Sequence, residues 1–396
     1  MGQNFASYEM ARDGEKFTGA ATPRWARRVN DLLATADIRV GGDRPWDIRV
    51  NDSRLYRRVL INGVTGMGDA YIDGWWDCEA IDQLLDRVLQ AGLPGKIPFD
   101  LRATGSYLLQ KVWNLQSRGR ARRNAESHYN TGNDLFQIML DRRMLYTCGY
   151  WKEAKNLDEA QEAKLELSCR KIGLRAGQRV ADIGCGWGGF AKYAAERHGA
   201  NVVAVNVSSE QVNFARESCR DLPVEVRLQD YRELNEPVDH VVSLGCMEHV
   251  GPKNHRVFMQ TAHRCLSNDG LFLLHFIASR NTYPNTQDRE LSWIEKHIFP
   301  GAVMPSLKHI GAAIDGLFVI EDLHNFGADY DTTLMAWLAN FEKGWPAIEG
   351  KYGPRFYRMW RYYLSICAGA FRCRKYQLWQ IVLSKNGVRG GYKAVR

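Results

Sequence analysis

A cluster of glycines after a short apolar run is the part of this sequence best suited to chemistry. The run Val180–Ile183 predicts a buried strand, and a helix is expected from about Phe190 to Arg197. Four glycines lie between them, at positions 184, 186, 188 and 189. A strand that passes through glycines into a helix lets backbone N–H groups approach a ligand closely. We therefore expect a binding site at this turn.

Cys148, Glu248, His275 and Tyr330 carry ionisable groups, and Glu248 stands where the ligand crevice of a doubly wound sheet is expected. Each also has a structural explanation. The cysteine suits a small buried position, the glutamate could cap the segment after its strand, and the tyrosine could pack over a helix that starts near Asp331. For a lone histidine, a core position with satisfied nitrogens would be the better explanation. We favour function because all four fall on loops or strand ends that a doubly wound sheet would place on one side.

Strands and helices alternate around the glycine turn. Amphipathic patterns predict helices at Ser209–Arg220 and Arg256–Leu266. Strands that are apolar throughout indicate a mostly parallel sheet covered on both faces, with the ligand beyond the carboxyl ends of the strands. The seven expected strands are Val180–Ile183, Asn201–Val207, Val224–Leu228, Val238–Leu244, Leu271–Ile277, Phe318–Leu323 and Leu378–Leu383.

The turn sequence Asp182-Ile-Gly-Cys-Gly is the pattern of enzymes that bind S-adenosylmethionine. A glycine turn alone would be weak support, but the strand pattern strengthens it. We predict an α/β protein: a seven-stranded, Rossmann-like class I S-adenosylmethionine-dependent methyltransferase domain with a smaller N-terminal domain.

Length and composition set broad limits. The chain has 396 residues, 45% of them hydrophobic, and a net charge of +8. This charge suits nucleic acid or an anionic membrane surface, and equally an ordinary basic protein. No apolar run is long enough to span a bilayer, and the N-terminus has no signal-peptide core. Nine cysteines without metal-like spacing indicate reduced thiols and no metal site. We expect a cytoplasmic protein, peripheral to the inner face of the cell membrane.

A basic segment divides the chain. Residues 116–124 carry four arginines and no apolar periodicity, which is typical of a linker or exposed loop. We predict an N-terminal lipid-docking domain at 1–115, a linker at 116–126 and a catalytic domain at 127–396. The arginines, at 118, 120, 122 and 123, would contribute to membrane docking, although a solvated linker explains them equally well.

Within the N-terminal domain, Ile48–Val50 and Leu60–Ile61 predict strand pieces, and Ile81–Leu89 predicts a helix. The adjacent Trp75 and Trp76 suit either a membrane interface or a small core, and the core is favoured.

Four segments, together with His275 and Cys367, resemble a known family. The segments are His128–Phe136, Tyr146–Trp151, Met247–Lys253 and His324–Asp331. Their order and spacing resemble the cyclopropane-fatty-acid-phospholipid synthases and the related mycolic acid methyltransferases, along nearly the whole chain. The resemblance implies transfer of the methyl group of S-adenosylmethionine to a cis double bond of an acyl chain in a membrane phospholipid. Loss of a proton to a bound bicarbonate ion then closes a three-membered ring.

The resemblance also implies the site residues. Cys367 would be a pocket-lining thiol and not a nucleophile. Asn206 stands where many such enzymes have an acidic residue, and Arg232 departs from residue types seen in some members. Bicarbonate would be held by Cys148, Glu248, His275, Ile277 (through its backbone) and Tyr330. S-adenosylmethionine would be held by Tyr146, Thr147, Gly184, Cys185, Gly186, Asn206, Val207, Gln211, Asp230, Tyr231 and Arg232.

The partners implied are a phospholipid bilayer surface and a second copy of the chain in a homodimer, with no nucleic acid. The acyl chain would enter an apolar tunnel walled by a helix at Arg355–Phe371 and by the segment Trp293–Met304. The small residues Cys367-Ala-Gly-Ala370 leave room beside that helix.

Two alternative functions remain. One is another methyltransferase, acting on RNA or a small molecule, although no aromatic-basic recognition module is visible. The other is a membrane-surface module that binds S-adenosylmethionine as a regulator.

Overall fold

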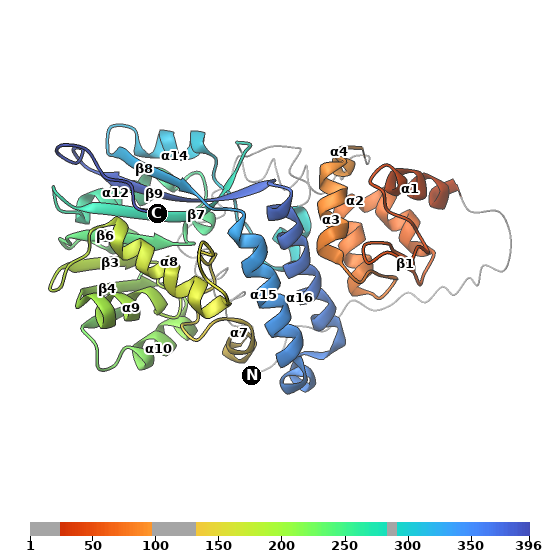
Figure 1. The fold of residues 1–396 in the computed structure, drawn as a ribbon, viewed down its shortest axis with the longest axis horizontal. Coiled ribbons are helices and arrows are strands. Elements are labelled where there is room, and N and C mark those ends of the chain that lie inside the picture. The colour runs from red at the N-terminus through yellow and green to blue at the C-terminus, as the bar shows by residue number, and fades with distance from the viewer. Residues whose placement is uncertain (1–23, 97–131, 283–290) are drawn as a thin grey trace.

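A seven-stranded sheet forms the larger part of the molecule (Figure 1). The computed structural model describes residues 24–96, 132–282 and 291–396. All seven predicted strands are confirmed: β3 (Arg179–Ile183), β4 (Asn201–Asn206), β5 (Val224–Leu228), β6 (His240–Leu244), β7 (Leu271–Ser279), β8 (Val319–Asn325) and β9 (Tyr376–Ser384). The order is β5-β4-β3-β6-β7-β9-β8. Strands β3 to β7 are parallel, and β9 runs antiparallel to β7 and β8, so the mostly parallel sheet is confirmed.

Helices cover both faces of the sheet because its strands are apolar on both sides. Val202 and Ala204 of β4 pack in a cluster with residues of α8 (Leu157–Lys171), α9 (Gly189–His198) and α10 (Ser209–Ser218). The alternate residues Val203 and Val205 point to the other face, in a cluster with α12 (His255–Cys265) and α14 (Leu307–Ile314). The predicted helices at 190–197, 209–220 and 256–266 correspond to α9, α10 and α12.

Two long helices, α15 (Asp329–Gly344) and α16 (Glu349–Arg372), stand between the sheet and the N-terminal helices (Figure 1). The predicted helix at 355–371 lies within α16. The small residues near its end let another helix approach, because a Cβ on Gly369 would lie 2.5 Å from the carbonyl oxygen of Asp82. The other elements of this part are α7 (Asn133–Met139), η1 (Tyr231–Glu233), α11 (Met247–Val250), α13 (Leu291–His297) and η2 (Trp345–Ala347).

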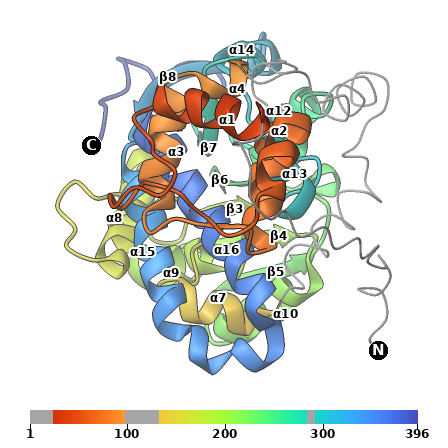
Figure 2. The same ribbon diagram turned by 90° about the vertical axis from the view of Figure 1, so that its right-hand side faces the viewer.

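The N-terminal elements are α1 (Arg24–Ala34), β1 (Arg49–Val50), α2 (Arg54–Ile72), β2 (Trp76–Asp77), α3 (Ile81–Gln90) and α4 (Leu93–Lys96). Figure 2 shows α1, α2 and α3 in front of the sheet. The strand predicted near Ile48 and the helix at 81–89 are confirmed. The strand predicted at Leu60–Ile61 is wrong, because both residues belong to α2, whose buried Leu55, Val59 and Leu60 follow helical spacing.

The two tryptophans occupy a core and its edge. Trp76 is fully buried, and its indole N–H donates to the carbonyl of Met67 at 2.9 Å. Trp75 is half-buried beneath the guanidinium groups of Arg54 and Arg58. One apolar cluster runs from α1, α2 and α3 into α15 and α16, so the N-terminal elements share a core with the rest of the chain.

The domain boundaries at 1–115 and 127–396 stay predictions, and the linker arginines lie outside the described residues. Among the helices that the structure describes, none has the length and apolar character needed to cross a membrane.

Candidate functional site

The first cavity opens where β3 ends in the glycine turn. Gly184 and Gly186 have φ values of +81° and +55°, a backbone region that favours glycine. A Cβ on Gly184 would lie 2.8 Å from the Cβ of Cys246, which follows β6. The Gly184 N–H donates to the carbonyl of Val205 at 2.9 Å. The glycines therefore let the turn pass between two neighbouring strand ends.

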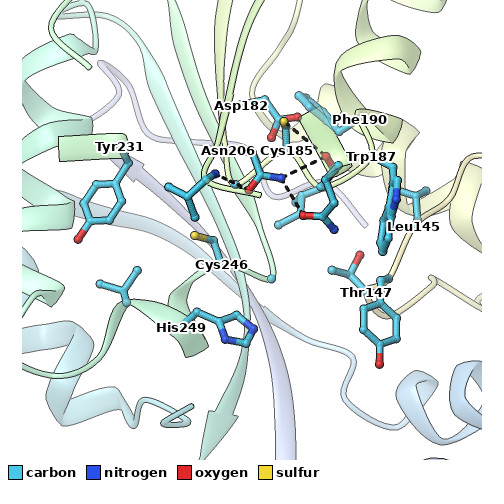
Figure 3. Close-up of a pocket in the computed structure, with 18 of the residues that line it drawn as sticks. Leu145, Thr147, Asp182, Cys185, Trp187, Phe190, Asn206, Tyr231, Cys246 and His249 are labelled. Carbon is cyan, nitrogen blue, oxygen red and sulfur yellow. Dashed lines mark hydrogen bonds between the residues drawn. The ribbon is translucent and has the colours of Figure 1, made fainter. Parts of the chain in front are cut away.

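Asn206, at the end of β4, orders the loop beside this turn (Figure 3). Its Oδ1 accepts the Val207 N–H at 2.7 Å, and its Nδ2 donates to Gln211 Oε1 at 2.8 Å and to the carbonyl of Gly186 at 3.3 Å. A carboxylate could not donate the last two hydrogen bonds. The amide therefore joins the glycine turn to the start of α10.

All eleven residues predicted to hold S-adenosylmethionine line this first cavity, from Tyr146 and Thr147 to Asp230, Tyr231 and Arg232. Other lining residues were missed as site residues. Asp182 could have been identified from the sequence because it is the first residue of the glycine-turn pattern. His249 could have been identified because it directly follows Glu248. Cys246 had no such signal in the sequence, whereas Phe299 lies in the segment Trp293–Met304 that was expected as a wall of the acyl tunnel. The remaining lining residues that the prediction omitted include Met144, Leu145, Trp187, Phe190 and Gly245.

Burial shifts the pKa values of two ionisable groups of this cavity toward the neutral form. It raises the pKa of the Asp182 carboxyl to about 7, and Asp182 Oδ2 has no hydrogen-bond partner within the part of the chain that the structure describes. Burial lowers the pKa of His249 to about 4, so its imidazole carries no charge at neutral pH. Figure 3 shows this ring among the labelled lining residues. A neutral imidazole does not repel a cationic ligand, whereas an imidazolium would.

A second, mostly apolar cavity adjoins the first. Both expected tunnel walls contribute to it: the 293–304 segment through Ile294 and Met304, and α16 through Ile366 and Cys367. The two cavities share one wall, formed by Tyr146, Thr147, Gly245, His249 and Phe299. A reagent bound in the first cavity and an apolar molecule in the second would therefore face each other across these residues.

Glu248, in α11, brings a carboxyl group to the second cavity. Its Oε1 accepts the backbone N–H of Ile277 at 2.6 Å, while Oε2 has no partner among the described residues. Burial raises the pKa of Glu248 to about 7, against the opposing effect of the Ile277 amide. Both protonation states are therefore accessible near neutral pH.

His275, on β7, lines the same cavity and is fully buried. Burial, with Lys164 and Lys171 nearby, lowers its pKa far below the ordinary value, so the ring is neutral. The amide nitrogen of Gln380 lies 3.3 Å from Nδ1. In this amide orientation Gln380 donates to Nδ1, which places the ring proton on Nε2. His275 Nε2 has no partner in the described part of the chain.

Five of the six predicted catalytic residues line this cavity: Glu248, His275, Ile277, Tyr330 and Cys367. Cys148 is not in the lining. It is fully buried, with its Sγ 3.9 Å from the hydroxyl of Thr333, one helical turn after Tyr330 on α15. Burial raises the thiol pKa of Cys367 to about 12, so this thiol is protonated. The roles of these residues stay predictions.

The sheet order and the glycine turn at the end of β3 define a class I S-adenosylmethionine-dependent methyltransferase. Solved structures agree. The cyclopropane synthase MmaA2 from Mycobacterium tuberculosis superposes with a TM-score of 0.64 at 29% identity, covering 67% of this chain and 98% of that one. Mycolic acid cyclopropane synthase CmaA1, complexed with SAH and CTAB, gives a TM-score of 0.63 at 30% identity, covering 67% of this chain and 98% of that one.

Sequence comparison defines the family. Residues 116–381 match the family model of mycolic acid cyclopropane synthetase, so the chain belongs to this family. The cyclopropane-fatty-acyl-phospholipid synthase of Escherichia coli strain K12 is 47% identical over 372 residues, which is 94% of this chain and 96% of the relative. The predicted family, fold class and enzyme class are thus confirmed, and the chain is an S-adenosylmethionine-dependent methyltransferase.

Proposed function

We propose that this enzyme transfers a one-carbon unit from S-adenosylmethionine to the cis double bond of an unsaturated acyl chain in a membrane phospholipid, forming a cyclopropane ring. The main support is the shared wall between the two cavities. An apolar cavity that meets the cofactor cavity in this way suits a hydrocarbon substrate. The identity of 47% to a phospholipid-acting relative favours the same substrate class.

S-adenosylmethionine would be held by the eleven predicted residues of the first cavity and would supply an electrophilic methyl group. The acyl double bond forms a carbon–carbon bond to this methyl as the carbon–sulfur bond breaks, and the bonding electrons stay on sulfur. The acyl chain then carries a positive charge. Loss of one proton from the added methyl leaves the electron pair that closes the ring.

The second cavity is suited to that charge. Tyr146, Phe299 and Tyr330 contribute aromatic rings to its lining. The face of an aromatic ring attracts a nearby cation, by about 0.5–2 kcal/mol depending on desolvation. The mostly apolar walls also limit the access of water, which would otherwise add to the cation.

Bicarbonate fits the polar end of the cavity. Glu248 Oε2 and His275 Nε2 are two buried polar atoms with no hydrogen-bond partner among residues 24–96, 132–282 and 291–396, so each could bind a hydrogen-bonding guest. With its proton on Nε2, His275 would donate to the anion, and the Tyr330 hydroxyl offers another donor. Glu248 in its charged form would accept a hydroxyl proton. Bicarbonate held by these residues would supply the base that accepts the proton.

Membrane docking, a homodimer and a cytoplasmic location stay parts of this proposal. The second candidate, methyl transfer to RNA or a polar small molecule, keeps the cofactor cavity but gives the apolar cavity no role. A regulatory binding module would leave Glu248 and His275 without chemistry to do.

One assay separates the lipid substrate from RNA and from a regulatory role. The purified full chain is incubated with methyl-labelled S-adenosylmethionine and either unsaturated phospholipid vesicles or RNA, each with and without added bicarbonate. We expect label in ring-containing acyl chains, with a rate that rises with bicarbonate. Label in RNA alone, or no label in any acceptor, would contradict the lipid substrate. A rate independent of bicarbonate, in buffers free of dissolved carbon dioxide, would contradict the anion.

A further inference from the structure

Two side chains from the N-terminal helices reach the second cavity. Val64 of α2 and Leu85 of α3 both line it, although neither lines the cofactor cavity. Both are half-buried and apolar. They belong to helices on the far side of α16 from the sheet (Figure 1). The hydrocarbon away from the reacting bond would therefore contact the N-terminal helices.

These helices are held firmly on α16. The backbone of α3 lies against Gly369, whose added Cβ would be 3.2 Å from the Cβ of Leu85. Arg372 of α16 donates to Asp82 Oδ2 at 2.6 Å, and Arg361 donates to the carbonyl of Glu79 at 2.7 Å. Leu85 is thus fixed beside Cys367 and Ala370, which line the same cavity.

Helix α2 is fixed in the same way on α13. A Cβ on Gly68 would lie 2.5 Å from the indole ring of Trp293, and the hydroxyls of Thr65 and Ser292 are 2.6 Å apart. Asp69 accepts a hydrogen bond from Lys296 at 2.6 Å. The packing of α2 on α13 therefore fixes the position of Val64 in the cavity wall.

This wall lies outside the part of the chain that matches the family model, which begins at residue 116. The polar groups of the cavity, Glu248 and His275, come from within the matched part. The reacting end of the cavity thus lies in the region that the family model covers. The N-terminal wall lies outside that region, but within the alignment to the Escherichia coli relative, which covers 94% of this chain.

We propose that Val64 and Leu85 determine acyl specificity by fixing how far the double bond can lie from the ends of the chain. The inference rests on the proposed lipid substrate. A rigid apolar wall at a fixed distance from the shared wall accommodates one position of the double bond along the acyl chain. With another position, the acyl chain either clashes with this wall or leaves empty space beside it. One methylene in an apolar pocket changes kcat/KM by about tenfold or more.

The test is a competition in one vesicle. Vesicles contain equal amounts of two phosphatidylglycerols that differ only in having cis-9 or cis-11 octadecenoyl chains, and the ratio of the two ring-containing products is measured. Val64→Ala and Leu85→Ala should change this ratio by about tenfold relative to wild type, and Leu85→Phe should change it in the opposite direction. Val88→Ala is the matched control, because Val88 packs against the core from the same helix without lining the cavity.

The two proposals fail in different ways. If the wild type labels neither lipid, the lipid substrate is wrong. If the wild type labels lipid but the ratio in Val64→Ala and Leu85→Ala equals that of Val88→Ala, the specificity role is wrong. Leu85→Met, which conserves volume, should fold and keep the wild-type ratio. A loss of total rate in the alanine variants with an unchanged ratio would indicate a merely structural wall.

Discussion

The cofactor cavity and the apolar cavity are neighbours built on different principles. The first is assembled from short segments at the ends of consecutive parallel strands, and its shape depends on backbone turns such as the one at Gly184. The second is lined by residues from Val64 to Leu378, on helices and strands far apart in the sequence, and its shape depends on side-chain size. A backbone-defined site leaves a local signature in the sequence, whereas a side-chain-defined site leaves almost none.

The largest expected effect separates chemistry from cofactor binding. Glu248 lines only the apolar cavity, so Glu248→Gln should bind S-adenosylmethionine with wild-type affinity. Its turnover should fall by about 10²–10⁴-fold, the usual contribution of a positioned proton-transfer group. Calorimetric binding and single-turnover rates measure the two quantities. A wild-type rate in this variant would remove Glu248 from the mechanism, and a parallel loss of affinity would mean that the two cavities do not act separately.

The second prediction concerns the pH dependence of folding. The pKa of Glu248 is about 7 in the folded protein against an ordinary value of 4.5, so the folded state retains a proton that the unfolded state releases. The free energy of unfolding of wild type, relative to Glu248→Gln, should therefore fall as pH rises from about 4.5 to 7 and then level off. The total change should be at most about 3 kcal/mol.

Denaturant unfolding of both proteins across this pH range measures that difference. Using the difference cancels the contribution of Asp182, whose pKa is raised in the same direction. A difference that stays flat with pH would show that the Glu248 carboxyl is not desolvated in the folded protein.

The third prediction uses two glycines of one turn. Gly184→Ala should weaken S-adenosylmethionine binding by about 100-fold, because a positive φ and a clash with Cys246 act together. Gly186→Ala is the matched control. Its φ is also positive, but no atom lies within 4 Å of the added Cβ, so backbone strain alone should cost about tenfold. Equal affinities in the two variants would show that the close approach to Cys246 does not shape the cavity.

The same contrast explains what the sequence could predict. The strands were predictable because most are short runs rich in apolar residues between turn residues, and the cofactor residues followed from the glycine turn and the family resemblance. The prediction of a strand at Leu60–Ile61 was wrong because it rested on two apolar residues and took no account of the surrounding sequence. Gly63 has a φ of +56° and kinks α2, and Gly66 and Gly68 lower the helix propensity of this segment further. Packing on α13 and α16 stabilises it instead.

The apolar cavity was predictable only in part. The segment 293–304 was expected as a wall because its apolar residues lack a clear surface face. The helix at 355–371 was expected as the other wall because it has an aromatic face and small residues at 367–370 that leave room beside it. The contributions of Val64 and Leu85 were missed, because nothing local to α2 or α3 distinguishes a residue that lines a cavity from one that fills a core. Only tertiary packing places them.

The smallest expected effect tests whether the apolar cavity acts mainly through shape. The thiol of Cys367 lines this cavity, but burial raises its pKa to about 12, so it is neither a ready nucleophile nor an anion at neutral pH. Cys367→Ala removes one sulfur atom from a wall that already contains small residues. We expect kcat/KM for unsaturated phospholipid to change by no more than about tenfold, since the loss is comparable to one methylene-sized apolar contact. A fall in kcat/KM of a hundredfold or more, restored by Cys367→Ser, would instead assign polar chemistry to this position. The cavity wall would then act through more than its shape.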